Sequence, residues 1–168
     1  TSPELIEIEF KEMGKWLTDA IETTRRLSID LSPPILRDEG LVQAIKWLAS
    51  QMKTQYGLKI DVQVDADDST FAIMDKNLHV LLFQLVRELL FNVVKHAGVT
   101  HAHVSLARID NNIRIDVSDE GQGFDPEVVQ AEGTQGLDNI RHRLNFAGGS
   151  LQIKSELDGG TRVTMFAP

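Results

Sequence analysis

Residues 75–96 read DKNLHVLLFQLVRELLFNVVKH and predict one long helix. The segment is apolar around most of its circumference, as expected of a helix buried in a core. At about 100° per residue, one narrow arc of it is polar. This arc collects Asn77, Gln84, Glu88, Asn92 and Lys95. Burying a carboxylate, an amide and an amine is costly unless each finds a partner. The arc is therefore an internal polar network, an edge facing water, or one wall of a ligand pocket.

The pocket interpretation gives three of these side chains a chemical role. Asn92 offers a hard oxygen ligand for Mg²⁺, Glu88 is able to polarise a water or act as a base, and Lys95 is able to meet a phosphate. The helix alone does not decide between the pocket and the two structural alternatives.

Two glycine-containing segments follow further along the chain. Asp119-Glu120-Gly121-Gln122-Gly123 comes directly after a predicted strand, and its glycines allow a sharp turn or the close approach of a ligand. Asp119 is placed to accept a hydrogen bond from a ligand amine. Gly133-Thr134-Gln135-Gly136-Leu137 opens a predicted helix, whose free backbone N–H groups are able to bind an anion. Arg141 and Arg143 follow, either as added charge for a phosphate or on a solvated face. A plain turn and an ordinary helix start are the structural alternatives.

The rest of the globular part predicts an α+β fold. Hydrophobic periodicity predicts further helices over residues 39–55 and 137–147, and strands over 59–64, 102–109, 113–118, 151–157 and 161–166. Because helices and strands do not alternate regularly, we expect a mixed, largely antiparallel sheet with helices on one face.

Residues 3–31 predict a separate helix with a heptad seam. The seam is formed by Ile6, Phe10, Met13, Leu17, Ala20, Thr24, Leu27 and Leu31. Such a stripe either docks on this chain's own domain or bundles with a second chain, and its length favours bundling. Ser32-Pro33-Pro34 ends the helix. We therefore divide the chain into residues 1–31 and a domain over 32–168.

Composition excludes several classes of protein. With 42% apolar and 25% charged residues the chain is an ordinary globular one, and its net charge of −8 argues against broad nucleic-acid binding. No cysteine, signal peptide or apolar run of membrane-spanning length is evident, so we expect a cytoplasmic domain without membrane contact. His101 and His103 share a strand face, but without an evident third ligand we interpret them as surface residues.

Taken together, the motifs resemble those of the ATP-binding domain of histidine kinases. Residues 88–97 resemble its N box, 119–124 its G1 box and 133–144 its G2 box, while 159–161 resemble its last strand. Residues 25–41 resemble the end of the dimerisation helix and its junction in the nitrate-sensor-like subfamily. Each motif is weak alone, but their order and spacing are highly specific.

The resemblance implies a Bergerat-type sandwich that binds ATP and Mg²⁺. Asp119 would hydrogen-bond the adenine amino group, with Thr161 nearby, and Asn92 would coordinate the Mg²⁺. Lys95 and His96 would lie near the phosphates.

The glycine-rich segments would frame a mobile lid over residues 125–135. Its hinges would be Gly121, Gly123, Gly133 and Gly136, with Leu137 next to the last of them.

The implied reaction is transfer of the ATP γ-phosphoryl group to a histidine, and from there to an aspartate of a response-regulator receiver domain. Glu88 would be the catalytic base that orients or activates the accepting histidine. The chain's histidines are His79, His96, His101, His103 and His142. None lies in residues 1–31, where the kinase family pairs two chains into a dimer, so we expect the acceptor to lie outside this fragment.

Two alternatives keep the same pocket. One is a serine kinase of the anti-sigma-factor type, and the other is a non-catalytic nucleotide-binding module that signals through dimer geometry. The heptad helix over residues 3–31 argues against the first, and against gyrase-like or chaperone ATPases. The sequence leaves open whether the parent protein is anchored in a membrane.

Overall fold

The computed structural model describes residues 13–14, 16–17, 33–65, 71, 75–126 and 135–168. The chain divides into two compact units, Thr1–Pro34 and Ile35–Pro168, close to the predicted boundary. Most of the predicted helix over residues 3–31 lies outside the described residues. Within it, the seam residues Met13 and Leu17 are helical, and they are 58% and 68% exposed.

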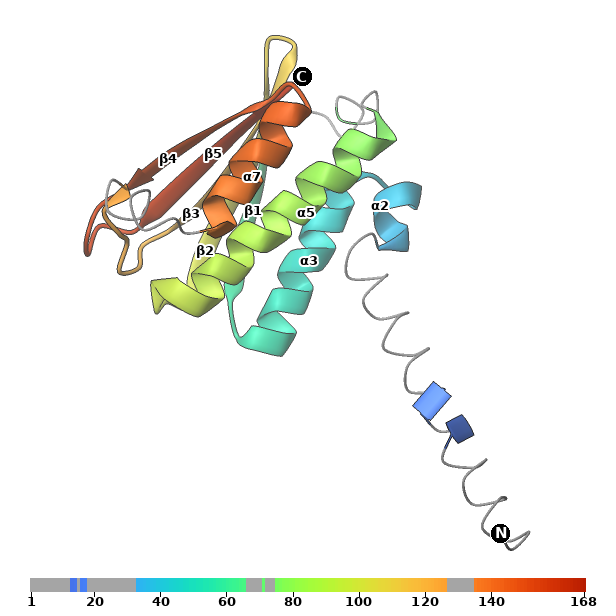
Figure 1. Cartoon of the computed structure of the whole chain (residues 1–168), viewed down its shortest axis with the longest axis horizontal. Coiled ribbons are helices and arrows are strands. Elements are labelled where there is room, and N and C mark those ends of the chain that lie inside the picture. Colours follow the sequence, from blue (N-terminus) through green and yellow to red (C-terminus); the bar gives the residue numbers. More distant parts are fainter. Residues whose placement is uncertain (1–12, 15, 18–32, 66–70, 72–74, 127–134) are drawn as a thin grey trace, which may run out of the picture. The chain divides into compact units, whose positions relative to one another are not determined.

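The larger unit contains the predicted mixture of helices and strands (Figure 1). Its elements are α2 (Pro34–Asp38), α3 (Leu41–Tyr56), β1 (Lys59–Asp65), α5 (Lys76–Asn92), η1 (Val93–Ala97), β2 (His101–Ile109), β3 (Asn112–Asp119), α7 (Gln135–Phe146), β4 (Ser150–Ser155) and β5 (Thr161–Ala167). The short helix α2 is not predicted by the sequence pattern, which shows only the prolines that precede it. The predicted loop over residues 66–69 lies outside the described residues.

The five strands form one mixed sheet in the order β1-β2-β3-β5-β4. β1 pairs with β2 in parallel, and the other three pairings are antiparallel. In the last pairings, Asp119 of β3 is opposite Thr161 of β5, which is in turn opposite Ser155 of β4. The predicted α+β class, with a largely antiparallel sheet, is confirmed.

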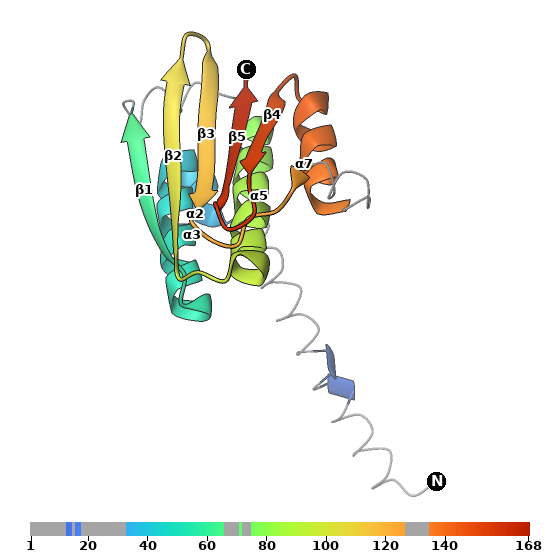
Figure 2. The same ribbon diagram turned by 90° about the vertical axis from the view of Figure 1, so that its left-hand side faces the viewer.

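Helices α3, α5 and α7 cover one face of the sheet (Figure 2). The core lies between the two layers and is built from the apolar positions that the periodicity predicts. From the helices, Ile45, Met52, Phe83 and Leu90 are at most 2% exposed, and from the sheet Val104, Leu106, Ile115 and Met165 are fully buried. Each such side chain contributes about 1.5–3 kcal/mol to stability. Gly57 ends α3 in the left-handed conformation, at φ 71°.

The central helix Lys76–Ala97 is long and apolar enough to cross a membrane, by length and mean hydropathy alone. The sequence-based expectation that no segment reaches this threshold is wrong. The buried side chains of this helix, among them Leu82, Phe83 and Leu85, belong to the core of the domain. The structure thus accounts for its hydropathy as that of a core helix.

The face of the sheet that points away from α3, α5 and α7 carries a polar network around Asp116, which is only 7% exposed. Its carboxylate accepts hydrogen bonds from Thr164 at 2.6 Å, Arg114 at 3.1 Å and Ser105 at 3.3 Å. The Nε of Arg114 lies 2.8 Å from Oδ2 of Asp116 and forms an ion pair with it, but its N–H is not aligned for a hydrogen bond. Burial raises the pKa of Asp116, but these hydrogen bonds and the Arg114 charge together bring the pKa below its ordinary value. The network links β2, β3 and β5.

Candidate functional site

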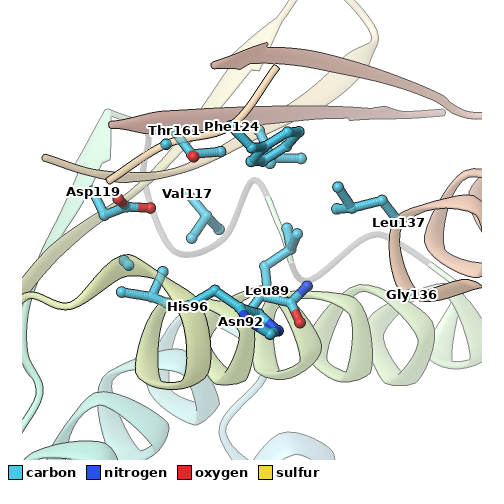
Figure 3. A pocket seen from close by; sticks show the side chains of 13 residues that line it. Leu89, Asn92, His96, Val117, Asp119, Phe124, Gly136, Leu137 and Thr161 are labelled. Atoms are coloured by element: carbon cyan, nitrogen blue, oxygen red, sulfur yellow. The ribbon is translucent and has the colours of Figure 1, made fainter. Parts of the chain in front are cut away.

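A cavity of about 390 Å³ opens between the helical layer and the sheet, in the size range of small-molecule sites (Figure 3). It brings together the end of the central helix, the end of β3 with the segment after it, the start of α7, and β5. The lining residues are Leu89, Asn92, Val93, His96, Ala97, Val117, Asp119, Gly123, Phe124, Gly136, Leu137, Thr161 and Val163.

Most of this lining is apolar. Leu89 and Val93 come from the helix, Val117 and Val163 from the sheet, and Phe124 from the segment after β3. Such walls suit a flat, largely apolar ring held between helix and sheet. Sequence analysis did not single out these residues for the site. They could have been found from their positions relative to the predicted site residues. Leu89 is one helical turn from Asn92, and Val117 shares a strand face with Asp119.

Asp119 provides the cavity's carboxylate. Its Oδ1 accepts a hydrogen bond from the backbone N–H of Gly121 at 2.9 Å, which fixes the side chain at the end of β3. Burial raises the pKa of Asp119, and hydrogen bonds from the backbone of Gly121 and Thr161 only partly oppose that shift. Removing water from the ionised carboxylate lowers the stability of the folded protein, and a bound ligand that donates hydrogen bonds to the carboxylate would offset this loss.

The helical wall is shaped by a π turn that the sequence did not predict. α5 runs as an α-helix to Asn92, and η1 continues it with the wider π geometry over Val93–Ala97. Asn92 and His96 both line the cavity, whereas Lys95 is exposed and does not line it. A wheel drawn at about 100° per residue fails beyond Asn92 because a π turn advances less per residue. π turns are frequent at functional sites.

Glu88 does not line the cavity. It lies one turn before Asn92, and its Oε2 is 3.6 Å from the Nη1 of Arg143 on α7. The Nη2 of Arg143 also donates to Oε1 of Gln84 at 2.5 Å. The predicted polar arc therefore has two roles: Gln84 and Glu88 join two helices, and Asn92 faces the cavity. Arg143 is thus not on a merely solvated face, and Arg141 pairs with Asp138 within α7.

We expect Arg143→Ala to destabilise the domain by about 1 kcal/mol, because it breaks the charged link between α5 and α7. The loss is modest because the ion pair between Arg143 and Glu88 is partly exposed to solvent. Urea unfolding measures this loss. Arg141→Ala is the matched control, since it removes the same charge from a pair inside one helix, and it should cost less than about 0.5 kcal/mol. Equal losses for the two variants would contradict the assignment of Arg143 as the cross-helix link.

Two glycines of the segment after β3 are packed too tightly for any side chain. A Cβ on Gly121 would lie 2.3 Å from the carbonyl oxygen of Ala97, and one on Gly123 would lie 1.9 Å from that of Glu156. Gly123 also has φ 58°. The structure thus gives both residues a packing reason to be glycine. Their predicted role as lid hinges stays a prediction.

The second glycine-rich segment is described only in part. Gly136 and Leu137, in the first turn of α7, line the cavity opposite the end of the central helix. Gly133 and the residues of the predicted lid from 127 to 134 lie outside the described residues.

The remaining histidines lie away from the cavity. His101 and His103 are exposed on β2, with His103 Nδ1 3.6 Å from Asp61 Oδ2. Among the described residues no group of three or more histidines and carboxylates is arranged to hold a metal ion. His79 is buried, and its Nε2 lies 2.7 Å from the carbonyl oxygen of Phe71.

Residues 77–168 match the family described as "Histidine kinase-, DNA gyrase B-, and HSP90-like ATPase". This match covers more than half of the chain, and the chain belongs to that family. Because the family consists of ATPases, membership implies binding of ATP.

Two similar curated proteins are named as histidine kinases. The chain is 28% identical over 160 residues to the signal transduction histidine-protein kinase/phosphatase DegS of Brevibacillus brevis, covering 95% of this chain and 40% of that protein. It is 33% identical over 149 residues to the oxygen sensor histidine kinase NreB of Staphylococcus carnosus, covering 88% and 42%. The chain thus spans about two fifths of the length of these relatives.

Solved structures share the fold. A histidine kinase domain from the Erythrobacter litoralis EL346 blue-light activated histidine kinase superposes with a TM-score of 0.60 at 24% identity, covering 76% of this chain and 60% of that one. The Acinetobacter baumannii histidine kinase AdeS superposes with a TM-score of 0.57 at 13% identity, covering 99% and 85%.

Proposed function

We propose that this chain is the ATP-binding catalytic part of a two-component sensor histidine kinase. One observation carries the proposal: a single cavity gathers residues from all three motif segments, with Asp119 and Thr161 on the sheet, Asn92 on the helix, and Gly136 at the start of α7. The relatives support a histidine kinase over the two alternatives, since DegS and NreB are both named as such and match most of the chain.

ATP fits the cavity by its chemistry. The apolar walls would hold the adenine ring, and the carboxylate of Asp119 would accept a hydrogen bond from its amino group. Asn92, His96 and the N-terminus of α7, where free backbone N–H groups favour anions, would hold the triphosphate. Lys95, exposed beside this region, adds positive charge.

Mg²⁺ fits the same end of the cavity. Asn92 is only partly exposed and lines the cavity, and its amide oxygen is the kind of hard ligand that Mg²⁺ takes beside phosphate oxygens and water. When bound, the ion neutralises charge on the phosphates. Within the described residues, Asn92 is the oxygen donor we assign to it.

The reaction is transfer of the γ-phosphoryl group from ATP to a ring nitrogen of a histidine that this chain does not supply. The chain's own residues bind and orient the nucleotide, which accounts for most of the catalysis in phosphoryl transfer. Glu88 lies one turn before Asn92 on α5 and outside the lining of the cavity. We assign it as the base that orients the incoming histidine, once it is released from Arg143.

The partners follow from this assignment. The heptad pattern of residues 3–31 would pair two copies of the protein, and a receiver-domain aspartate would take the phosphoryl group from the histidine. We place the domain in the cytoplasm, where ATP is available.

The test has two parts. Isothermal titration of this chain should show ATP and ADP binding that is stronger with Mg²⁺, and Asn92→Ala, which removes the amide oxygen, should weaken the Mg²⁺-dependent component. With γ-³²P-ATP the chain alone should not become labelled, whereas a longer protein containing it should carry an acid-labile label on a histidine. An acid-stable serine label in a partner would favour the serine kinase, and no nucleotide binding would overturn the proposal.

A further inference from the structure

Ser155, the last residue of β4, joins three parts of the site with one hydroxyl group. Its Oγ lies 2.9 Å from the backbone N of Phe124, 2.9 Å from the carbonyl oxygen of Gly160, and 2.9 Å from Oγ1 of Thr161. Neither composition nor motif spacing singles out this serine, and it does not line the cavity itself. Phe124 and Thr161, which do line it, lie side by side in Figure 3.

The protons of this cluster can be assigned by counting. A serine hydroxyl has one proton to donate and two lone pairs to accept with. The Phe124 N–H must donate to Ser155, which uses one lone pair. The carbonyl of Gly160 has no proton, so Ser155 must donate its own proton there. The contact with Thr161 then requires that Thr161 donates to the second lone pair of Ser155.

This assignment leaves Thr161 without a free proton. Its Oγ1 therefore offers only lone pairs to the cavity. Asp119, its partner across β3 and β5, offers only acceptors when it is ionised. The polar end of the cavity, as formed by these two side chains, then accepts hydrogen bonds and donates none.

The surrounding backbone holds the cluster in place. The N–H of Asp158 donates to the carbonyl of Gln122 at 2.6 Å, and Gly123 packs against the carbonyl oxygens of Glu156 and Gly160. The segment after β3 and the β4–β5 connection are thus locked together around Ser155, so its hydroxyl has little freedom to choose other partners.

We propose that Ser155 is a positioning residue that orients the Thr161 hydroxyl as an acceptor, and so makes the cavity select a 6-amino purine over a 6-oxo purine. A 6-amino group brings two N–H donors to this acceptor end, whereas a 6-oxo purine brings an oxygen that these two side chains leave unpaired, with its ring N1–H as the one donor beside it. The inference rests on the proposed function, because it concerns which nucleotide the same cavity takes.

The experiment compares the dissociation constants of ATP and ITP, which differ at position 6 and at the adjacent ring nitrogen, by isothermal titration with Mg²⁺. The unaltered chain should bind ATP at least about 10-fold more tightly, as one lost hydrogen bond of about 1.4 kcal/mol requires. Ser155→Ala should reduce this preference several-fold, since the freed Thr161 proton is then able to donate to the 6-oxo group. The preference is the ratio of the two dissociation constants measured on the same sample, so any unfolded fraction of the protein affects both constants equally and cancels from the ratio.

Three further variants separate positioning from general damage. Ser150 is an exposed serine at the other end of β4, and Ser150→Ala should leave the preference for ATP unchanged. Ser155→Thr keeps a hydroxyl group at position 155 and should also keep the preference for ATP. Thr161→Val removes the hydroxyl through which Ser155 acts, so adding Ser155→Ala to it should change the preference no further. If Ser155→Ala does not fold, Ser155→Cys, with its weaker donor and acceptor, should show the same loss.

The outcomes distinguish the two proposals. An unaltered chain that binds neither nucleotide overturns the proposed function. A chain that prefers ATP, but keeps that preference in Ser155→Ala or shows additive effects in the double variant, overturns the role of Ser155 alone.

Discussion

Replacing Asp119 with Asn is expected to weaken ATP binding about 100-fold while making the free protein more stable at neutral pH. The affinity falls because a charged acceptor for the ligand amine is lost, and such hydrogen bonds contribute about 1.5–3 kcal/mol. The stability rises because the buried carboxylate is costly without a ligand, as its raised pKa indicates.

The gain in stability of Asp119→Asn depends on pH, and its sign follows from the raised pKa of Asp119. A carboxyl whose pKa is raised on folding favours the folded state below the unfolded value of 3.8, and this contribution is lost as the pH rises through the folded value. Thermal unfolding of the free protein should therefore show a small difference between Asp119→Asn and the unaltered chain near pH 3.5. The gap should widen toward neutral pH and then level off.

Asp110→Asn is the control for net charge. Asp110 is exposed in the β2–β3 turn and has φ 56°, which Asn tolerates, so it removes the same charge far from the cavity. This variant should bind ATP as the unaltered chain does. An Asp119→Asn protein that binds ATP normally, or that is less stable at pH 7, would contradict the assignment of Asp119.

Gly121→Ala is expected to destabilise the domain by about 3 kcal/mol and to abolish measurable ATP binding. The added methyl would lie 2.3 Å from the carbonyl oxygen of Ala97 and 2.7 Å from its Cβ. Both are parts of a packed helix end, and the same carbonyl accepts a hydrogen bond from the Gln122 N–H at 3.0 Å. The clash therefore has to move the backbone, which is more costly than rotating a side chain. Urea unfolding and titration with ATP measure the two effects.

Two matched glycine variants separate steric clash from backbone strain. In Gly136→Ala the new methyl meets no atom of the described residues within 4 Å, so the cost in stability should be close to zero. In Gly57→Ala the methyl likewise meets no described atom, but φ is 71° there, so this variant should cost about 1–2 kcal/mol. If Gly121→Ala cost no more than Gly57→Ala, close packing would not be the reason for glycine at this position.

Periodicity and turn chemistry predict most of the fold, because they act locally. The alternation of Ile113, Ile115 and Val117 identifies a strand with one buried face, and Gly57 identifies the end of a helix. The short helix α2 could not be predicted, since five residues give no periodicity. The parallel pairing of β1 with β2 depends on contacts between distant segments.

The site was predictable where a residue type carries its own chemistry. Asp119, Asn92 and Thr161 were expected from their motifs and lie on one cavity. Ser155 was not expected, because its importance comes from three partners that only the folded chain brings to it. The exposed position of Lys95 likewise depends on the π turn, which has no signature in the sequence.

The order of the sheet leaves β1 and β4 as its two edges (Figure 2). An edge strand has unpaired backbone groups that invite pairing with another chain, and among the described residues no helix packs on the sheet face opposite α3, α5 and α7. β1 alternates its buried-side residues with Lys59, Asp61 and Asp65, and β4 carries Lys154 near its end. Charged side chains at such edges oppose strand addition, because association would strip them of water. We therefore expect these charges to disfavour aggregation by strand addition at β1 and β4.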